Sequence, residues 1–246
     1  MCGRVVSSTP IPRIAEFFSA RASEEAESLP PRYNVAPTDP VPMLVTVRDA
    51  TDRRVEVASW GIVPVWARNP DPDRRSRGPS LLFNIRAETA ASRHRQALVQ
   101  RRCAVIVDGF YEWSGPREKV RGKTQRVPWF VHPRDRSPLA FAGVWASTSD
   151  GVQTAIFTTT PNHTMEQIHD RMPACLDADQ LAAWLDPGFS APDHVEMLAG
   201  LLRPAAPSLL EAYRVDPAVN SSRAEGPQLR EPLEHDQLAW GGLALE

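Results

Sequence analysis

Short apolar runs follow one another through the middle of the chain, at lengths typical of β-strands. They are rich in β-branched and aromatic residues, and Gly, Pro and charged turns separate them. They predict strands at 43–47, 55–63, 103–113, 127–132, 139–146 and 154–160. Strands are therefore expected to dominate the middle of the chain.

Helical spacing of apolar residues occurs on either side of these runs. The stretch 11–21 places Ile14, Phe17 and Phe18 on one side of a predicted helix. Further helices are predicted at 87–101, 162–170, 177–186 and 191–202. The Arg-, Pro- and Asp-rich stretch 68–80 is predicted to be an exposed loop, and no repeat or long linker divides the chain. The pattern predicts an α+β fold and a single compact domain over residues 1–246.

Composition places the chain among ordinary globular proteins. Its 246 residues are 42% hydrophobic, which is enough for a proper core. No stretch of about 18 apolar residues predicts a membrane span, and no secretory signal precedes the domain, so we expect a cytoplasmic protein. The three cysteines are too scattered for a disulfide framework or a paired zinc site, and Cys103 and Cys175 are expected in the core.

The net charge of −2 argues against nucleic-acid binding by bulk charge alone. Of the 28 basic residues, 26 are arginines, whose planar fork suits phosphates better than the point charge of lysine does. A bias toward arginine codons accounts for much of this excess. Individual arginines must therefore be judged by their neighbours.

The chain begins MCGR, which places a cysteine directly after the initiator methionine. Removal of Met1 leaves Cys2 with a free α-amine and a thiol, which titrate near about pH 8 and about pH 8.5. The amine can form a Schiff base with an aldehyde, and the thiol can then close a five-membered thiazolidine ring. The alternative is that Cys2 is a small, half-buried residue with no chemical role.

Two polar clusters adjoin the apolar runs, where a scaffold often presents its site residues. The segment DGFYEW places Glu112 and Trp113 at the end of a hydrophobic strand, where a carboxylate can orient or deprotonate an amine and an indole can stack on a base. The segment LLFNIRAET places Asn84 and Arg86 on one side of an extended stretch, which suits a phosphate and its sugar. The alternative for the first segment is a turn residue beside a core aromatic, and the alternative for the second is a structural salt bridge.

A third cluster, TTTPNHTMEQIHDRMP, ends a short predicted helix with His169 and Arg171. Histidine exchanges protons near physiological pH, and the arginine can hold an anion beside it. His163, Glu166 and His169 lie within two turns, but HxxExxH is not the HExxH zinc pattern. We therefore expect no metal site and no cofactor.

Seven blocks of this sequence resemble the SRAP (SOS response-associated peptidase) family in content and order. They are MCGR, RYNVAP, WGIVPVW, NIRAET, DGFYEW, IHDRMP and VNSSRAEGPQL. The resemblance implies a mixed, largely antiparallel, barrel-like β core flanked by helices. It also implies covalent capture of abasic sites in single-stranded DNA, through a Schiff base and then a thiazolidine crosslink that protects the damaged strand. Lyase and thiol autopeptidase activities are further implications.

The resemblance assigns roles to the catalytic candidates. Cys2 becomes the nucleophile, and Glu112 assists ring opening of the sugar and Schiff-base formation. His169 transfers protons at the sugar hydroxyl, and Asn84 positions the abasic sugar.

The resemblance also predicts a surface that binds DNA. Its expected members hold phosphates, donate a hydrogen bond or stack on bases: Arg4, Arg86, Arg171, Thr158, Pro37, Trp66 and Trp113. A wedge against the bases would kink the strand, so single strands and single-strand/double-strand junctions are the expected partners. The protein is expected to be a monomer that associates with the nucleoid when bound to DNA.

The sequence departs from the family pattern near the DNA edge, and other functions remain open. The loop at 68–80 is longer than in a bacterial member of the family, and Val65-Trp66 stands where that member has two tryptophans. One alternative is an N-terminal-nucleophile thiol hydrolase or peptidase that uses Cys2 and His169. Another is a module that binds single-stranded DNA without a covalent step.

Overall fold

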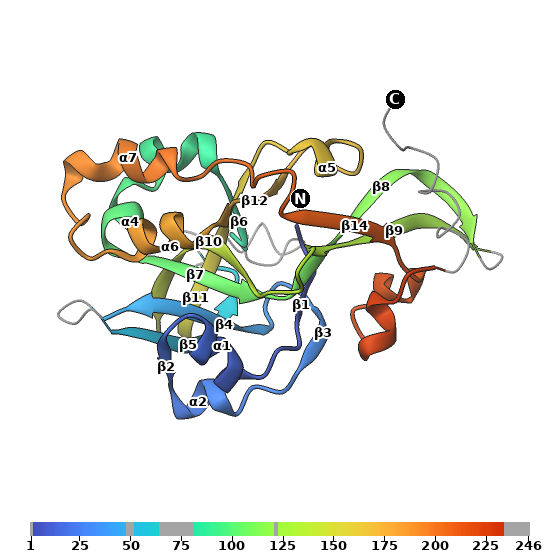
Figure 1. The fold of residues 1–246 in the computed structure, drawn as a ribbon, viewed down its shortest axis with the longest axis horizontal. Helices are drawn as coiled ribbons and strands as arrows, with labels where there is room; N and C mark the ends of the chain where they lie inside the picture. Colours follow the sequence, from blue (N-terminus) through green and yellow to red (C-terminus); the bar gives the residue numbers. More distant parts are fainter. Residues whose placement is uncertain (1, 48–51, 64–80, 121–122, 234–246) are drawn as a thin grey trace, which may run out of the picture.

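Five strands close into a barrel at the centre of the molecule (Figure 1). The computed structural model describes residues 2–47, 52–63, 81–120 and 123–233. The barrel strands are β4 (Pro40–Thr46), β5 (Arg53–Trp60), β7 (Arg102–Val107), β10 (Leu139–Thr148) and β11 (Gly151–Thr159). Neighbouring strands are antiparallel except β11 and β5, whose parallel pairing closes the barrel. The predicted α+β class with a largely antiparallel, barrel-like core is confirmed.

A second sheet extends from one side of the barrel, in the order β14-β9-β8-β1-β3. Its strands are β1 (Val5–Ser7), β3 (Arg32–Val35), β8 (Gly109–Val120), β9 (Lys123–Pro133) and β14 (Leu210–Arg214). In Figure 1, β1 lies between the barrel and the long β8–β9 hairpin. The start of the chain is thereby placed at the junction of the two sheets.

The single strand predicted at 103–113 is wrong, because Asp108 divides it into β7 and β8. The Asp108 carboxylate accepts hydrogen bonds from the backbone N–H and hydroxyl groups of Ser8 and Thr9, at 2.5 to 2.9 Å. These bonds tie the end of β1 to the point where the chain leaves the barrel. The chain therefore passes from one sheet to the other at a fixed position.

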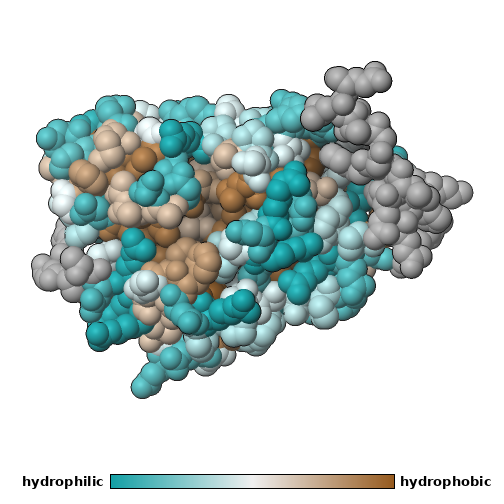
Figure 2. Space-filling view, viewed as in Figure 1, coloured by the Kyte–Doolittle hydropathy of each residue, from teal (hydrophilic) through white to brown (hydrophobic). Residues whose placement is uncertain are grey.

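Helices and short strands cover the outside of the barrel, where most of their apolar side chains pack against alternate residues of the barrel strands. Met165 and Met172 lie instead in the cluster that contains Cys2. The α-helices are α1 (Ile11–Phe17), α2 (Glu24–Glu27), α3 (Ala90–Arg93), α4 (Arg95–Gln100), α5 (His163–Glu166), α6 (Ala178–Leu185) and α7 (Val195–Gly200). The remaining strands are β2 (Ala20–Ala22), β6 (Asn84–Arg86), β12 (Met172–Pro173) and β13 (Cys175–Leu176). Figure 2 shows hydrophobic residues gathered over the centre and left of this face, with hydrophilic residues around them.

Several predicted helices are shorter or broken in the structure. The helix expected at 11–21 ends at Phe17, and Ser19 has a φ of 50° before the chain enters β2. Ile14 and Phe18 are buried, but Phe17 is 55% exposed, so the three side chains predicted on one side of the helix do not share one environment. The stretch 87–101 is divided into the 3-10 turn η3 (Ala87–Thr89), α3 and α4.

The other predicted helices also differ at their ends. The helix predicted at 162–170 shortens to α5, and the one at 191–202 to η4 (Pro192–His194) followed by α7. The helix predicted at 177–186 is confirmed as α6, which Asp177 and Gln180 begin with a reciprocal capping box. The predicted loop at 68–80 lies outside the described residues.

Candidate functional site

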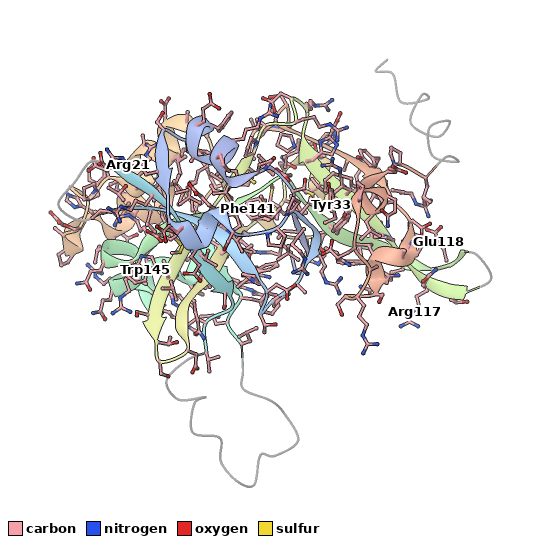
Figure 3. The ribbon with its side chains drawn as sticks, turned by 90° about the horizontal axis from the view of Figure 1, so that it is seen from below. Arg21, Tyr33, Arg117, Glu118, Phe141 and Trp145 are labelled. Carbon is pink, nitrogen blue, oxygen red and sulfur yellow. The ribbon has the colours of Figure 1, made fainter. Side chains whose placement is uncertain are left out.

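Cys2 packs against side chains that point into the barrel. It is fully buried in a cluster with side chains of barrel strands, among them Trp60, Val105, Phe141 and Ile156. Alternate residues of the same strands pack outward against the helices, so the barrel-strand side chains of this cluster point into the barrel interior. Figure 3 shows Phe141 near the middle of the body. The residue predicted as nucleophile is thus enclosed by the scaffold.

Glu112 lies beside Cys2 because β1 and β8 are antiparallel neighbours. The Tyr111 N–H donates to the carbonyl of Arg4 at 2.9 Å, and the register pairs Val5 with Phe110. Glu112 is only 2% exposed, within β8 and not at its end as predicted. Burial, and then the negative charge of Glu112, raise the pKa of the Cys2 thiol well above its ordinary value. The thiol and the carboxylate are therefore electrostatically coupled.

Asn84 holds the backbone of Cys2 from the other side. Its Nδ2 donates to the Cys2 carbonyl at 2.6 Å, across 82 positions of sequence. In β6, Ile85 is buried while Asn84 and Arg86 flank it, so their predicted location on one side of the strand is confirmed. Asn84 Oδ1 is buried without a hydrogen-bond partner in the described part of the chain. This oxygen is available to accept a hydrogen bond from a substrate hydroxyl.

His169 follows α5, which begins where the Asn162 side chain accepts the backbone N–H of Met165 at 3.0 Å. Its side chain is 26% exposed, and Nδ1 lies 2.8 Å from the Asp170 carboxylate and 3.0 Å from the backbone N–H of Arg171. In the neutral ring Nδ1 accepts from Arg171 and Nε2 carries the proton, whereas in the charged ring Nδ1 donates to Asp170. His169 thus has a partner in either protonation state.

Arg171 and Thr158 lie where β11 is flanked by β6 and β12. Thr158 is fully buried, and its carbonyl accepts from the Arg171 guanidinium at 2.5 Å. The same guanidinium forms a two-pronged pair with the carboxylate of Glu88. This ion pair joins η3, which follows β6, to the residue before β12, and it was not predicted from the sequence.

The other two predicted phosphate ligands differ from each other in environment. The Arg4 side chain donates to Asn34 Oδ1 at 2.7 Å and to the Val219 carbonyl at 3.0 Å. Asn34 in turn donates to backbone carbonyls of the segment after Val219, including that of Ala224 at 2.9 Å. Arg86, by contrast, is exposed on β6. Arg4 therefore also ties β1 to the C-terminal segment.

The predicted base-contacting residues lie on β8 and in the turn before β4. Half-buried Trp113 donates from its indole to Asn220 Oδ1 at 2.5 Å, in the 3-10 turn η5 (Pro217–Asn220); η6 (Pro227–Arg230) follows. Pro37 occupies a turn in which Thr38 has a φ of 87°, a conformation that a β-branched residue rarely adopts. Trp66 lies outside the described residues.

Sequence reasoning missed Asn34, Glu88 and Asn220 as partners of the site residues. Each stands in one of the family-like blocks, RYNVAP, NIRAET and VNSSRAEGPQL, and that position was the only signal. Among the described residues, no group of three or more His, Cys, Asp or Glu side chains is arranged to hold a metal ion. No helix in that part of the chain is long and apolar enough to cross a membrane.

The chain is similar to a set of known proteins along nearly its whole length. The SOS response associated peptidase (SRAP) family model matches residues 1–222. The Bacillus subtilis abasic site processing protein YoqW is 32% identical over 94% of this chain and 99% of its own length. The Gallus gallus abasic site processing protein HMCES is 28% identical over 95% of this chain and 78% of its own length.

A solved structure supports the same architecture. The crystal structure of a Bacteroides thetaiotaomicron protein has a TM-score of 0.74 and 23% identity, and the match covers 94% of this chain and 100% of that one. At this level of identity the likeness concerns the fold.

Proposed function

The chain belongs to the SRAP family, and from that membership we propose that it processes abasic sites in single-stranded DNA by covalent capture on Cys2. The observation that carries the proposal is the buried Cys2, with its carbonyl held by Asn84 and its thiol coupled to Glu112. Two relatives that match nearly the whole chain are named abasic site processing proteins, which supports this substrate.

The chemistry proceeds in two steps once Met1 has been removed. An abasic deoxyribose opens to an aldehyde, and the Cys2 α-amine adds to it with loss of water to give a Schiff base. The thiol then adds to the imine carbon, and its proton passes to the nitrogen, so a thiazolidine ring forms. The amine reacts first, because the thiol can close the ring only on the imine carbon that the amine has formed.

The neighbouring groups have distinct proposed roles. Glu112 accepts and returns the protons that move during Schiff-base formation and ring closure. His169 transfers a proton at the sugar hydroxyl, and Asn84 Oδ1 accepts a hydrogen bond from the sugar. Arg4, Arg86 and Arg171 hold the flanking phosphates and Thr158 adds a hydrogen bond, while Pro37, Trp66 and Trp113 contact bases.

A denaturing gel tests this function directly. The methionine-trimmed protein is mixed with a single strand that carries one abasic site, beside an undamaged strand and a Cys2→Ala variant. We expect a heat-resistant shifted band that requires both Cys2 and the abasic site. If no band forms although Cys2 is confirmed at the N-terminus, covalent capture is excluded and amide substrates should be screened for a thiol hydrolase.

A further inference from the structure

The guanidinium of Arg171 is already bound to an anion of the protein itself. Its NH1 and NH2 groups donate to the two carboxylate oxygens of Glu88, the second at 2.9 Å. The Arg171 side chain is 11% exposed and that of Glu88 is 52% exposed. The carboxylate therefore occupies the outward donors of a guanidinium that is otherwise enclosed.

A DNA phosphate would use the same two donors. Carboxylates and phosphates both match the fork of a guanidinium and bind it through two parallel hydrogen bonds. The hydrogen bond from Arg171 lowers the pKa of Glu88, so the carboxylate is fully ionised near neutral pH. Two full negative charges therefore compete for one positive group.

We propose that Glu88 determines specificity by occupying the outward donors of the Arg171 guanidinium, so that the phosphates of undamaged strands cannot bind them. The Glu88 carboxylate is displaced from these donors only when an abasic strand is captured. This inference rests on the proposed function, because it takes Arg171 as a phosphate ligand of the captured strand. An undamaged strand has phosphates at every position but gains nothing at Cys2. Glu88 thus lowers the occupancy of the site by undamaged DNA.

The surroundings of Arg171 allow the exchange without loss of its position. The Thr158 carbonyl holds NH2 at 2.5 Å independently of Glu88. Arg171 Nε is buried and has no hydrogen-bond partner within the described ranges, so the guanidinium keeps a further donor for a phosphate oxygen. Glu88 lies within η3 on the surface, and its half-exposed carboxylate can rotate into solvent. Because half-exposed ion pairs are weak, displacing Glu88 changes affinity by at most about fivefold.

The test measures binding of an undamaged fluorescent single strand by anisotropy between about 50 and 200 mM salt, the range over which phosphate contacts change affinity strongly. Cys2→Ala is the background, so no covalent step contributes. We expect Glu88→Gln to bind up to about fivefold more tightly. Its plot of log affinity against log salt should be steeper by about 0.7, the value for one more phosphate contact on a single strand.

Two further variants assign the effect to Arg171. Glu118→Gln removes the same charge from a similar pair, in which Glu118 lies 2.6 Å from Arg214 and the two side chains are 49% and 25% exposed. Figure 3 shows Glu118 far out on the β8–β9 hairpin, away from Phe141 in the barrel. We expect Glu118→Gln to leave affinity and salt dependence unchanged. Adding Arg171→Gln to Glu88→Gln should abolish the gain.

The inference is overturned if Glu88→Gln binds no more tightly than Glu118→Gln, if it binds more weakly, or if the gain persists without Arg171. Thermal unfolding of each variant excludes a loss of folded protein as the cause. The crosslinking gel with Cys2 intact gives a separate answer about the proposed function. A crosslink without the affinity gain overturns only the role of Glu88, and the gain without a crosslink overturns only covalent capture.

Discussion

Two buried thiols in the same barrel have different surroundings. Cys103 lies on β7 with its sulfur 3.3 Å from the Thr154 hydroxyl, and burial raises the pKa of Cys103 to about 12. Cys2 is equally buried, but Glu112 and Asn84 adjoin it. Burial alone makes a thiol inert, so reactivity at Cys2 has to come from its α-amine and from the polar groups around it.

The largest expected effect separates the two thiols by substitution. Cys2→Ala should abolish the crosslink to an abasic strand, because both reacting groups belong to that residue. Cys103→Ala should crosslink at nearly the rate of the unchanged protein. Its free energy of unfolding should fall modestly, because the substitution leaves a small cavity. Quantified gel bands under single-turnover conditions measure both rates. A crosslink that survives Cys2→Ala, or one that fails in a folded Cys103→Ala protein, contradicts the comparison.

Glu112→Gln should move two properties of Cys2 in opposite directions. Loss of the general base should slow crosslinking by about 100-fold or more. Loss of the negative charge should lower the pKa of the Cys2 thiol, which increases the thiolate fraction and speeds its alkylation by iodoacetamide at a given pH. Alkylation is followed by mass spectrometry of the peptide that contains Cys2. Parallel loss of both rates would indicate a damaged fold instead.

Asn84→Ala removes the donor that holds the Cys2 carbonyl at 2.6 Å. We expect crosslinking to slow by about tenfold, which corresponds to one hydrogen bond of roughly 1.4 kcal/mol. The matched change beside the other thiol is Thr154→Val, which removes the hydroxyl bonded to the Val144 carbonyl at 3.1 Å. Thr154→Val should reduce the free energy of unfolding by about 1 to 3 kcal/mol while crosslinking is unchanged. Equal effects of the two changes on crosslinking would refute a specific role for Asn84.

The smallest expected effect is in the pH dependence of alkylation. A raised pKa means that the protonated thiol persists to higher pH, so alkylation of Cys2 should still be rising above about pH 9, where a free cysteine approaches its plateau. Free cysteine under the same conditions provides the reference curve. A Cys2 curve that levels off at lower pH than free cysteine would show a depressed pKa and contradict the burial argument.

The sequence predicted those parts of the fold in which local pattern and burial agree. The strands β4, β5, β10 and β11 follow from β-branched and aromatic runs, and α6 follows from its apolar spacing. The prediction failed at Asp108, where bonds to Ser8 and Thr9 some 100 residues away divide one apolar run between two sheets. Short strands such as β1 and β3 have too few residues to show a period, and pairing with distant strands stabilises them.

The candidate site shows the same limit. Alternation in NIR correctly placed Asn84 and Arg86 on one side of β6. The pairs Arg171–Glu88 and Arg4–Asn34 join residues 83 and 30 positions apart, and each arginine is satisfied by a partner that no local pattern indicates. Which groups an arginine contacts depends on how strands are ordered in the sheets, and that order is a property of the whole chain.

The most direct test of the central claim is the chemical state of Cys2 in the crosslinked product. The product is unfolded, treated with iodoacetamide and borohydride, digested and analysed by mass spectrometry. Capture by both the amine and the thiol predicts a Cys2 peptide that carries the sugar with loss of one water, resists reduction and takes up no alkyl group. A peptide that is reduced by borohydride and alkylated on sulfur would show that the reaction stops at the Schiff base, and ring closure on Cys2 would be contradicted.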